Sequence, residues 1–203
     1  MYNEKLNQLR LRKAAIMNHD KMAKSAVVLP LIENEGQLYI LFEKRSMMLR
    51  HQPGEICFPG GGIELDDKGP MKAAIRETCE ELGLQPTDIN VICPLDIVVS
   101  PFTAIIYPYL AIIGSPEKIV LTDEVEKIIL IPLDYLKQNP PLINNLHISL
   151  QASDDFPFHL IPQGPNYPFK HSKYPQIFYQ YNDTVVWGLT ALILTHFLEL
   201  LNN

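Results

Sequence analysis

Apolar and polar residues alternate along the chain at two different periods, which predict a mixture of strands and helices. Two apolar-rich runs, 26–32 and 37–44, are joined by the turn sequence ENEG and predict a β-hairpin. Pro30 lies in the first run and indicates an edge strand or a bulge, because proline has no N–H to donate within a sheet. Further strands are predicted at 91–99, 104–113 and 124–131.

Helical spacing predicts helices at 2–24, 70–82, 134–138 and 184–201. Pro70 is suited to the start of the second helix, and Gly83 is suited to its C-terminal end. Residues 139–182 are rich in proline and aromatic side chains, and they predict loops and short strands laid over a surface. Strands with separate helices indicate one α+β or αβα domain that covers residues 1–203.

Composition and charge narrow the class of protein. The chain has 203 residues, of which 47% are hydrophobic and 20% charged, values typical of a globular domain. The formal net charge of −6 argues against nucleic acid as a partner. No apolar run approaches the roughly 18–20 residues that cross a bilayer, so no membrane association is predicted. The charged N-terminal segment has no secretory pattern, and three cysteines without a CxxC pair predict packing roles and a cytoplasmic location.

The helix predicted at 70–82 carries an unusual set of acidic side chains. Glu77, Glu80 and Glu81 span an arc of only about 100° on the helix surface. Like charges this close repel each other by roughly 0.2–0.5 kcal/mol a pair. Such a cluster is either a solvated acidic face or a site for Mg²⁺ or Mn²⁺, which prefer carboxylate oxygens. The residues around the helix favour the second interpretation.

Two segments around this helix match known motifs. The sequence RETCEELGL (76–84) with FPGGG (58–62) upstream resembles the motif of the Nudix hydrolase family. The segment LFEKRSMMLRHQPGEICFPGG (41–61) is similar to an additional signature of the coenzyme A pyrophosphatases within that family. The chain departs from the expected pattern at Lys68, where the family has a glutamate, at Thr78, where it has an aliphatic residue, and at Ala104, where a glycine is expected.

The resemblance implies a fold and a metal site. The fold is a Nudix-type αβα sandwich with a mixed sheet. Divalent cations, Mg²⁺ or Mn²⁺, are held by Glu77, Glu80 and Glu81, with a backbone carbonyl near Gly61 as a further ligand. Arg76 belongs to the catalytic group and orients the acidic side chains by ion pairing.

The resemblance also implies a reaction and its other site residues. A metal-bound water attacks the diphosphate, and its proton passes to Glu80, to Glu81 or to Glu124, which is otherwise a solvated charge at a strand start. Arg45 and Arg50 are the candidates for binding phosphate, since guanidinium groups match phosphate oxygens in pairs. Gly60 and Gly61 allow the backbone to approach substrate and helix closely.

The implied substrate is a small nucleotide, coenzyme A or acyl-coenzyme A, cleaved to 3′,5′-ADP and (acyl-)4′-phosphopantetheine. One alternative is a Nudix pyrophosphatase for ADP-ribose or another nucleoside diphosphate derivative. A second is a Nudix-fold regulator that binds a nucleotide without cleaving it. The aromatic side chains of 139–182 have two interpretations, because they either stack on a base or bury the surface of a homodimer.

Overall fold

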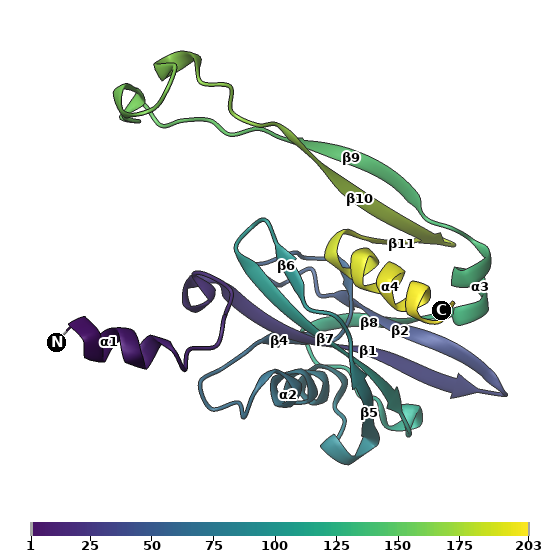
Figure 1. Cartoon of the computed structure of the whole chain (residues 1–203). Coiled ribbons are helices and arrows are strands. Elements are labelled where there is room, and N and C mark those ends of the chain that lie inside the picture. Colours follow the sequence, from purple (N-terminus) through teal and green to yellow (C-terminus); the bar gives the residue numbers. More distant parts are fainter. Residues whose placement is uncertain (1, 203) are drawn as a thin grey trace.

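The computed structural model describes residues 2–202, and its centre is an eight-stranded mixed sheet (Figure 1). Five strands follow the order β3-β2-β1-β7-β5, with β4 beside β1, β6 beside β7 and β8 beside β2. Only β1 and β7 pair in parallel among these strands. The strands are β1 (Ala23–Asn34), β2 (Gln37–Arg45), β3 (Ile56–Cys57), β4 (Gly60–Gly62), β5 (Ile89–Pro94), β6 (Val98–Ser100), β7 (Ala104–Ile113) and β8 (Val125–Pro132).

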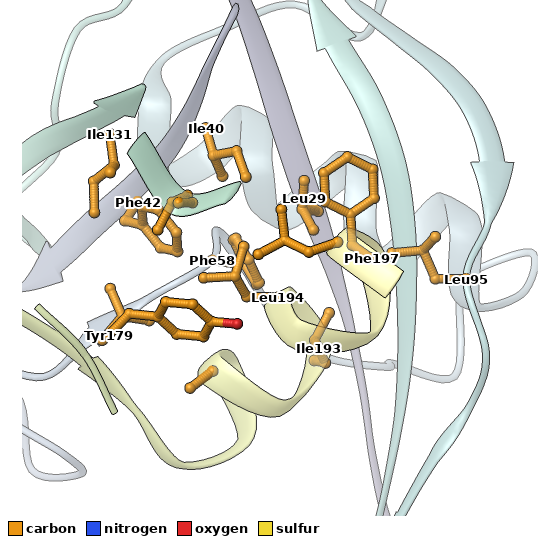
Figure 2. Packing of buried hydrophobic residues seen from close by; sticks show 14 of the residues in the cluster. Leu29, Ile40, Phe42, Phe58, Leu95, Ile131, Tyr179, Ile193, Leu194 and Phe197 are labelled. Atoms are coloured by element: carbon orange, nitrogen blue, oxygen red, sulfur yellow. The ribbon is translucent and has the colours of Figure 1, made fainter. Parts of the chain in front are cut away.

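Helices cover both faces of this sheet, which confirms the predicted αβα arrangement. Helix α2 (Pro70–Leu82) lies on one face and α4 (Gly188–Leu200) on the other (Figure 1). The side chains of β1 alternate between two buried clusters, because successive residues of a strand point to opposite faces. Ala26, Val28 and Ile32 pack on the α2 side. Leu29 packs on the α4 side with Phe42, Phe58 and Phe197 (Figure 2).

The paired strands β1 and β2 diverge, and the segment that holds β3 and β4 fills the space between them. Residues 31–34 of β1 pair with β2, whereas residues 25–27 pair with β4 on the same side. The N–H of Val28 donates to Pro59 in this inserted segment at 2.9 Å. Pro30 points its nitrogen to the same side, between the two partners, where no N–H is needed. The prediction of an edge strand or bulge at Pro30 was therefore wrong, since β1 is a central strand.

The predicted helix at 2–24 was also wrong in extent. Helix α1 (Tyr2–Leu9) is followed by a turn and a short 3₁₀-helix (His19–Lys21), and β1 begins at Ala23. Asn18 adopts a left-handed conformation with φ 62°, and the N–H of Ala23 donates to Thr103 at 3.0 Å. The expected apolar stripe, including Leu9 and Met17, is exposed. Strand pairing thus replaces a helix that has no core to pack against.

Residues 139–182 form an extended arm instead of loops laid over a surface. Strands β9 (Leu142–Ile148) and β10 (Ser172–Tyr181) pair as an antiparallel hairpin that projects from the body (Figure 1). We call β9, β10 and the segment between them the arm. Its tip contains two 3₁₀-helices, Phe158–Leu160 and Gly164–Asn166. Several of the tip aromatics pack on one another, among them Phe156, Phe158, Tyr167 and Phe169.

The C-terminal helix starts later than predicted. Residues 184–187 form strand β11 (Thr184–Trp187), which pairs with β10, and only then does α4 begin at Gly188. The β-branched Val185 and Val186 suit this strand, and the ring of Trp187 stacks on Phe178 across it. The remaining helix is α3 (Leu133–Gln138), and 3₁₀-helices lie at Pro86–Asp88 and Pro116–Lys118. No helix among residues 2–202 is both long and apolar enough to cross a membrane.

Candidate active site

Helix α2 holds the acidic residues against residues 58–62, FPGGG, which we call the glycine segment. It begins with Pro70 and ends before Gly83, as predicted. Ala73, Ala74 and Leu82 are buried between the helix and the sheet, so the helix cannot rotate freely. The Thr78 hydroxyl donates to the Ala74 carbonyl at 2.7 Å, which explains how this residue fits the buried position where the family has an aliphatic side chain.

Arg76 is the centre of an ion-pair network. Its guanidinium donates to both carboxylate oxygens of Asp67, at 3.0 and 3.1 Å, and to the Gly62 carbonyl at 3.1 Å. Nη1 lies 3.0 Å from the carboxylates of both Glu77 and Glu80. The same guanidinium lowers the pKa of Asp67 below its usual range. Arg76 therefore fixes the loop before α2 and two of the three helix glutamates at once.

Asp67 was not assigned to this network from the sequence. Its carboxylate also accepts from the backbone N–H of Glu64 at 2.9 Å, so it closes the turn and anchors Arg76. The neighbouring Lys68, which replaces the family glutamate, is exposed. The acidic pattern of residues 64–67 was the available signal for a carboxylate partner of Arg76.

Glu81 differs from its neighbour Glu80 in its surroundings. The Glu80 side chain is 59% exposed, whereas Glu81 is 4% exposed as a residue. The N–H of Gly60 donates to Glu81 Oε2 at 2.8 Å. Burial raises the pKa of Glu81, and the nearby charge of Glu43 raises it further. The helix thus presents one carboxylate to solvent and keeps the next one inside.

Glu43 is a site residue that sequence reasoning missed. It lies on β2 and is 1% exposed. Its side chain is on the face of the sheet that α2 covers, where it interacts with Glu81. Burial raises its pKa as well. The Cys57 thiol donates to Glu43 Oε1 at 3.3 Å, and burial raises the pKa of that thiol and keeps it protonated. The signal in the sequence was a charged residue at a strand position where the alternation requires an apolar one.

Gly60 and Gly61 allow this close packing. A Cβ on Gly60, where φ is 146°, would lie 2.4 Å from the carbonyl oxygen of Ala26. A Cβ on Gly61 would lie 2.5 Å from the Glu77 carboxyl carbon. The first glycine lets β4 approach β1, and the second leaves room for a helix glutamate.

A cavity of about 590 Å³ opens on the other side of the glycine segment. Its polar lining includes Arg45, Glu55 and the backbone of Gly60 and Gly61, and its apolar lining includes Phe102, Leu146, Tyr174 and Trp187. The rings of Phe102 and Tyr174 meet edge to face at 5.9 Å, which brings the loop before β7 against the arm. Gly60 and Gly61 therefore border both the cavity and the acidic side chains.

Of the other predicted site residues, Arg45 lies at the cavity, whereas Glu124 and Arg50 are not among the residues that line it. Arg45 lines the cavity and donates to the His51 carbonyl at 3.4 Å. Glu124 is exposed at the start of β8, and its carbonyl accepts from the N–H of Ser46 at 2.8 Å. Arg50 is exposed in the loop after β2 and is not among the residues that line the cavity. Ala104, at the predicted glycine position, is an ordinary strand residue that pairs with Ala23.

The donor set fits a hard divalent cation. Within residues 2–202, no three His, Cys, Asp or Glu side chains are already arranged as a metal-binding group, since Arg76 engages Glu77 and Glu80. The buried carboxyl groups of Glu43 and Glu81 nevertheless interact beside Gly60, and the Glu77 carboxyl lies against Gly61. One buried oxygen, Glu43 Oε2, has no hydrogen-bond donor among the described residues. Carboxylate oxygens at such density suit Mg²⁺ or Mn²⁺. The assignment of Glu77, Glu80, Glu81 and Gly61 as ligands stays a prediction.

Comparison with known proteins agrees with this geometry. Residues 22–148 match the model of the NUDIX domain. The chain is 33% identical over 158 residues to mouse peroxisomal coenzyme A diphosphatase NUDT7, which covers 74% of this chain and 64% of that protein. It is 32% identical to human mitochondrial coenzyme A diphosphatase NUDT8, over 88% of this chain and 70% of the human one. The chain thus spans slightly less than two thirds of the mouse relative.

A solved structure supports the fold. The MutT/nudix family protein from Enterococcus faecalis aligns with a TM-score of 0.55 at 16% identity, over all of this chain and 70% of that chain. This likeness concerns the fold alone. Three findings agree: the match over residues 22–148, two relatives above 30% identity, and the mixed sheet with helix α2 against the glycine segment. The chain belongs to the Nudix family.

Proposed function

We propose that the protein is a metal-dependent hydrolase that cleaves the diphosphate of coenzyme A or acyl-coenzyme A. One water is consumed, one P–O bond of the diphosphate breaks, and the products are 3′,5′-ADP and (acyl-)4′-phosphopantetheine. The observation that carries the proposal is the cavity, which is lined by Arg45 and the glycine segment together with apolar and aromatic side chains. The names of the mouse and human relatives, both coenzyme A diphosphatases, support the same substrate class.

The polar and the apolar lining residues of the cavity suit the two halves of this substrate. Arg45 and the backbone of Gly60 and Gly61 are suited to the diphosphate, because a guanidinium stays charged and donates in pairs. Tyr174 and Leu146, from the arm, offer apolar surface to the pantetheine or acyl portion. A diphosphate linked to a purely polar group would gain little from this apolar lining.

The residues for the cation are Glu77, Glu80 and Glu81, with the backbone at Gly61. A bound Mg²⁺ or Mn²⁺ neutralises charge on the diphosphate and lowers the pKa of a coordinated water. Arg76 holds Glu77 and Glu80 in place from the side. Glu81, Glu80 and Glu124 stay the candidates for accepting the proton. The raised pKa of Glu81 suits that task, because its neutral form is favoured by burial.

We retain the cytoplasm as the proposed location and a homodimer as a proposed assembly. The two relatives described above are peroxisomal and mitochondrial by name, so location differs within the family.

The test is a substrate panel with Mg²⁺ that contains coenzyme A, an acyl-coenzyme A, ADP-ribose and a diadenosine polyphosphate, with products separated by chromatography. We expect 3′,5′-ADP from the two coenzyme A compounds at a higher kcat/KM than for the others. Turnover of ADP-ribose alone would assign the protein to the alternative substrate class. Nucleotide binding without products would assign it to the regulators and overturn the proposal.

A further inference from the structure

Glu43 occupies a position that normally requires an apolar side chain. It lies on β2 between the buried Phe42 and the half-buried Lys44, and its own residue exposure is 1%. A buried carboxylate is strongly unfavourable unless it is paired or coordinates a metal. Its presence in the middle of the sheet therefore calls for a partner.

Only one of the two oxygens of the Glu43 carboxylate accepts a hydrogen bond from a donor group within residues 2–202. Oε1 accepts from the Cys57 thiol at 3.3 Å, a weak donor. Oε2 is buried and has no hydrogen-bond donor among the described residues. Neither basic neighbour has a hydrogen bond to Glu43 among the described contacts. Lys44 Nζ pairs with Glu126 at 2.7 Å, and Arg45, whose Nε donates to the His51 carbonyl, acts on Glu43 through its charge.

The second carboxylate that Glu43 meets is Glu81 of α2. The two carboxyl groups lie within hydrogen-bonding reach of each other, and each acts on the other electrostatically. One oxygen of Glu81 is already occupied by the Gly60 N–H at 2.8 Å. Two buried carboxyl groups in contact are stable only when they share a proton or bind a cation.

We propose that Glu43 is a further ligand of the divalent cation held by the glutamates of α2, and that it binds through Oε2 while the Cys57 thiol orients it. This ligand comes from the central sheet, upstream of the motif that contains the helix glutamates. The inference rests on the metal dependence in the proposed function, but not on the identity of the substrate.

The test is metal binding without substrate. In the full chain, Glu43→Gln keeps the shape of the side chain and removes its charge. Titration with Mn²⁺, followed by the electron paramagnetic resonance signal of the free ion, should give a Kd at least about tenfold higher than that of the wild type, the scale expected when a group close to a metal is lost. In EDTA, the variant should melt at the same temperature as the wild type or higher, because a buried charge has been removed.

Glu126→Gln is the matched control. Glu126 is an exposed glutamate on the neighbouring strand β8, so its loss should leave the Mn²⁺ affinity unchanged. If Glu43→Gln melts too low to be titrated, Glu43→Asp retains the charge but withdraws the oxygens by one methylene. That variant must then show the same loss of Mn²⁺ affinity.

The outcomes separate this inference from the proposed function. Wild-type Mn²⁺ affinity in folded Glu43→Gln would overturn the inference alone. Weaker binding by the variant, in a protein that does not cleave coenzyme A, would support the inference and refute the substrate. Absence of Mn²⁺ binding to the wild type would overturn both.

Discussion

Glu80 and Glu81 are neighbours on helix α2, but the Glu80 side chain extends into solvent and the Glu81 side chain is buried in the protein. Glu80 reaches solvent and pairs with Arg76 at 3.0 Å, whereas Glu81 is enclosed by Gly60 and Glu43. A charged carboxylate stays hydrated at the position of Glu80, whereas at the position of Glu81 it loses hydration, which is unfavourable in free energy. Of these two proposed ligands, Glu80 is therefore the one that Arg76 orients, and Glu81 is the one whose pKa is raised by its surroundings.

Glu81→Gln is expected to lower kcat by at least ~10²-fold, the scale for loss of a catalytic or metal-orienting group. The amide oxygen of glutamine still accepts from the Gly60 N–H. Because burial disfavours the charged form of Glu81, the substitution should not lower the melting temperature at neutral pH. Steady-state kinetics with coenzyme A and a thermal melt in EDTA measure the two effects. Near-normal turnover by the folded variant would contradict the site assignment.

The glycine segment and helix α2 act as one unit at the scale of elements. The segment fills the fork between β1 and β2, and its backbone contacts both the strand on one side and the helix glutamates on the other. Arg76 ties the end of the segment, at Gly62, to the helix. The positions of the carboxylates therefore depend on the pairing of β3 and β4 as much as on α2 itself.

Two adjacent glycines are expected to respond differently to the same substitution. A Cβ on Gly60 meets backbone atoms of β1, so Gly60→Ala should cost roughly 1–3 kcal/mol of unfolding free energy, the usual cost of overpacking. The three atoms nearest to a Cβ on Gly61 all belong to the carboxyl group of Glu77, which can turn away. Gly61→Ala should therefore retain most of the stability but weaken Mn²⁺ binding, since Glu77 is displaced.

Urea denaturation and Mn²⁺ titration of both variants provide the measurement. The wild type is the reference for both, and each variant controls for the general effect of adding a methyl group in this segment. Equal loss of stability in the two variants would contradict the assignment of separate roles.

At the scale of the whole molecule, the cavity depends on parts of the chain that are far apart in sequence. Its lining residues come from the glycine segment, the loop before β7, the arm and the start of α4. The edge-to-face contact of Phe102 with Tyr174 joins the body to the arm. Tyr174 of the arm lines the cavity, whereas the tip aromatics pack on one another. Stacking of the arm aromatics on a base stays a prediction. The homodimer and the single domain over 1–203 stay predictions.

Tyr174→Ala is expected to raise the KM for coenzyme A by about threefold to tenfold, which corresponds to the ~0.5–1.5 kcal/mol of an aromatic contact. The kcat should change little, since the ring lies on the cavity wall and away from the acidic residues. Tyr167→Ala is the control, because Tyr167 belongs to the same arm but packs on Phe169 in the tip. Initial-rate kinetics measure both variants. A similar KM increase in the control, or none in Tyr174→Ala, would contradict a role of the arm in binding.

The sequence by itself determined the elements whose formation follows local rules. The hairpin at 26–44 follows from alternation and a turn, the helix at 70–82 from its spacing between proline and glycine, and the strand at 104–113 from its apolar run. The cluster of helix glutamates was identified from its spacing on one helix surface, whereas Arg76 and the metal role of the cluster came from the resemblance to the Nudix motif. These features require only neighbours within a few residues of each other.

Only the tertiary structure decided the features that depend on distant partners. Glu43 meets Glu81 because the Glu43 side chain extends from β2 to the face of the sheet that α2 covers. Among the acidic residues of the loop before α2, Asp67 is the one that forms hydrogen bonds with Arg76. Pro30 is tolerated in a central strand because β1 changes partners beside it, and β11 forms because β10 offers an edge. Pairing and burial between distant segments outweigh local preference at these positions, since the free energy of a buried or hydrogen-bonded group depends on what surrounds it in space.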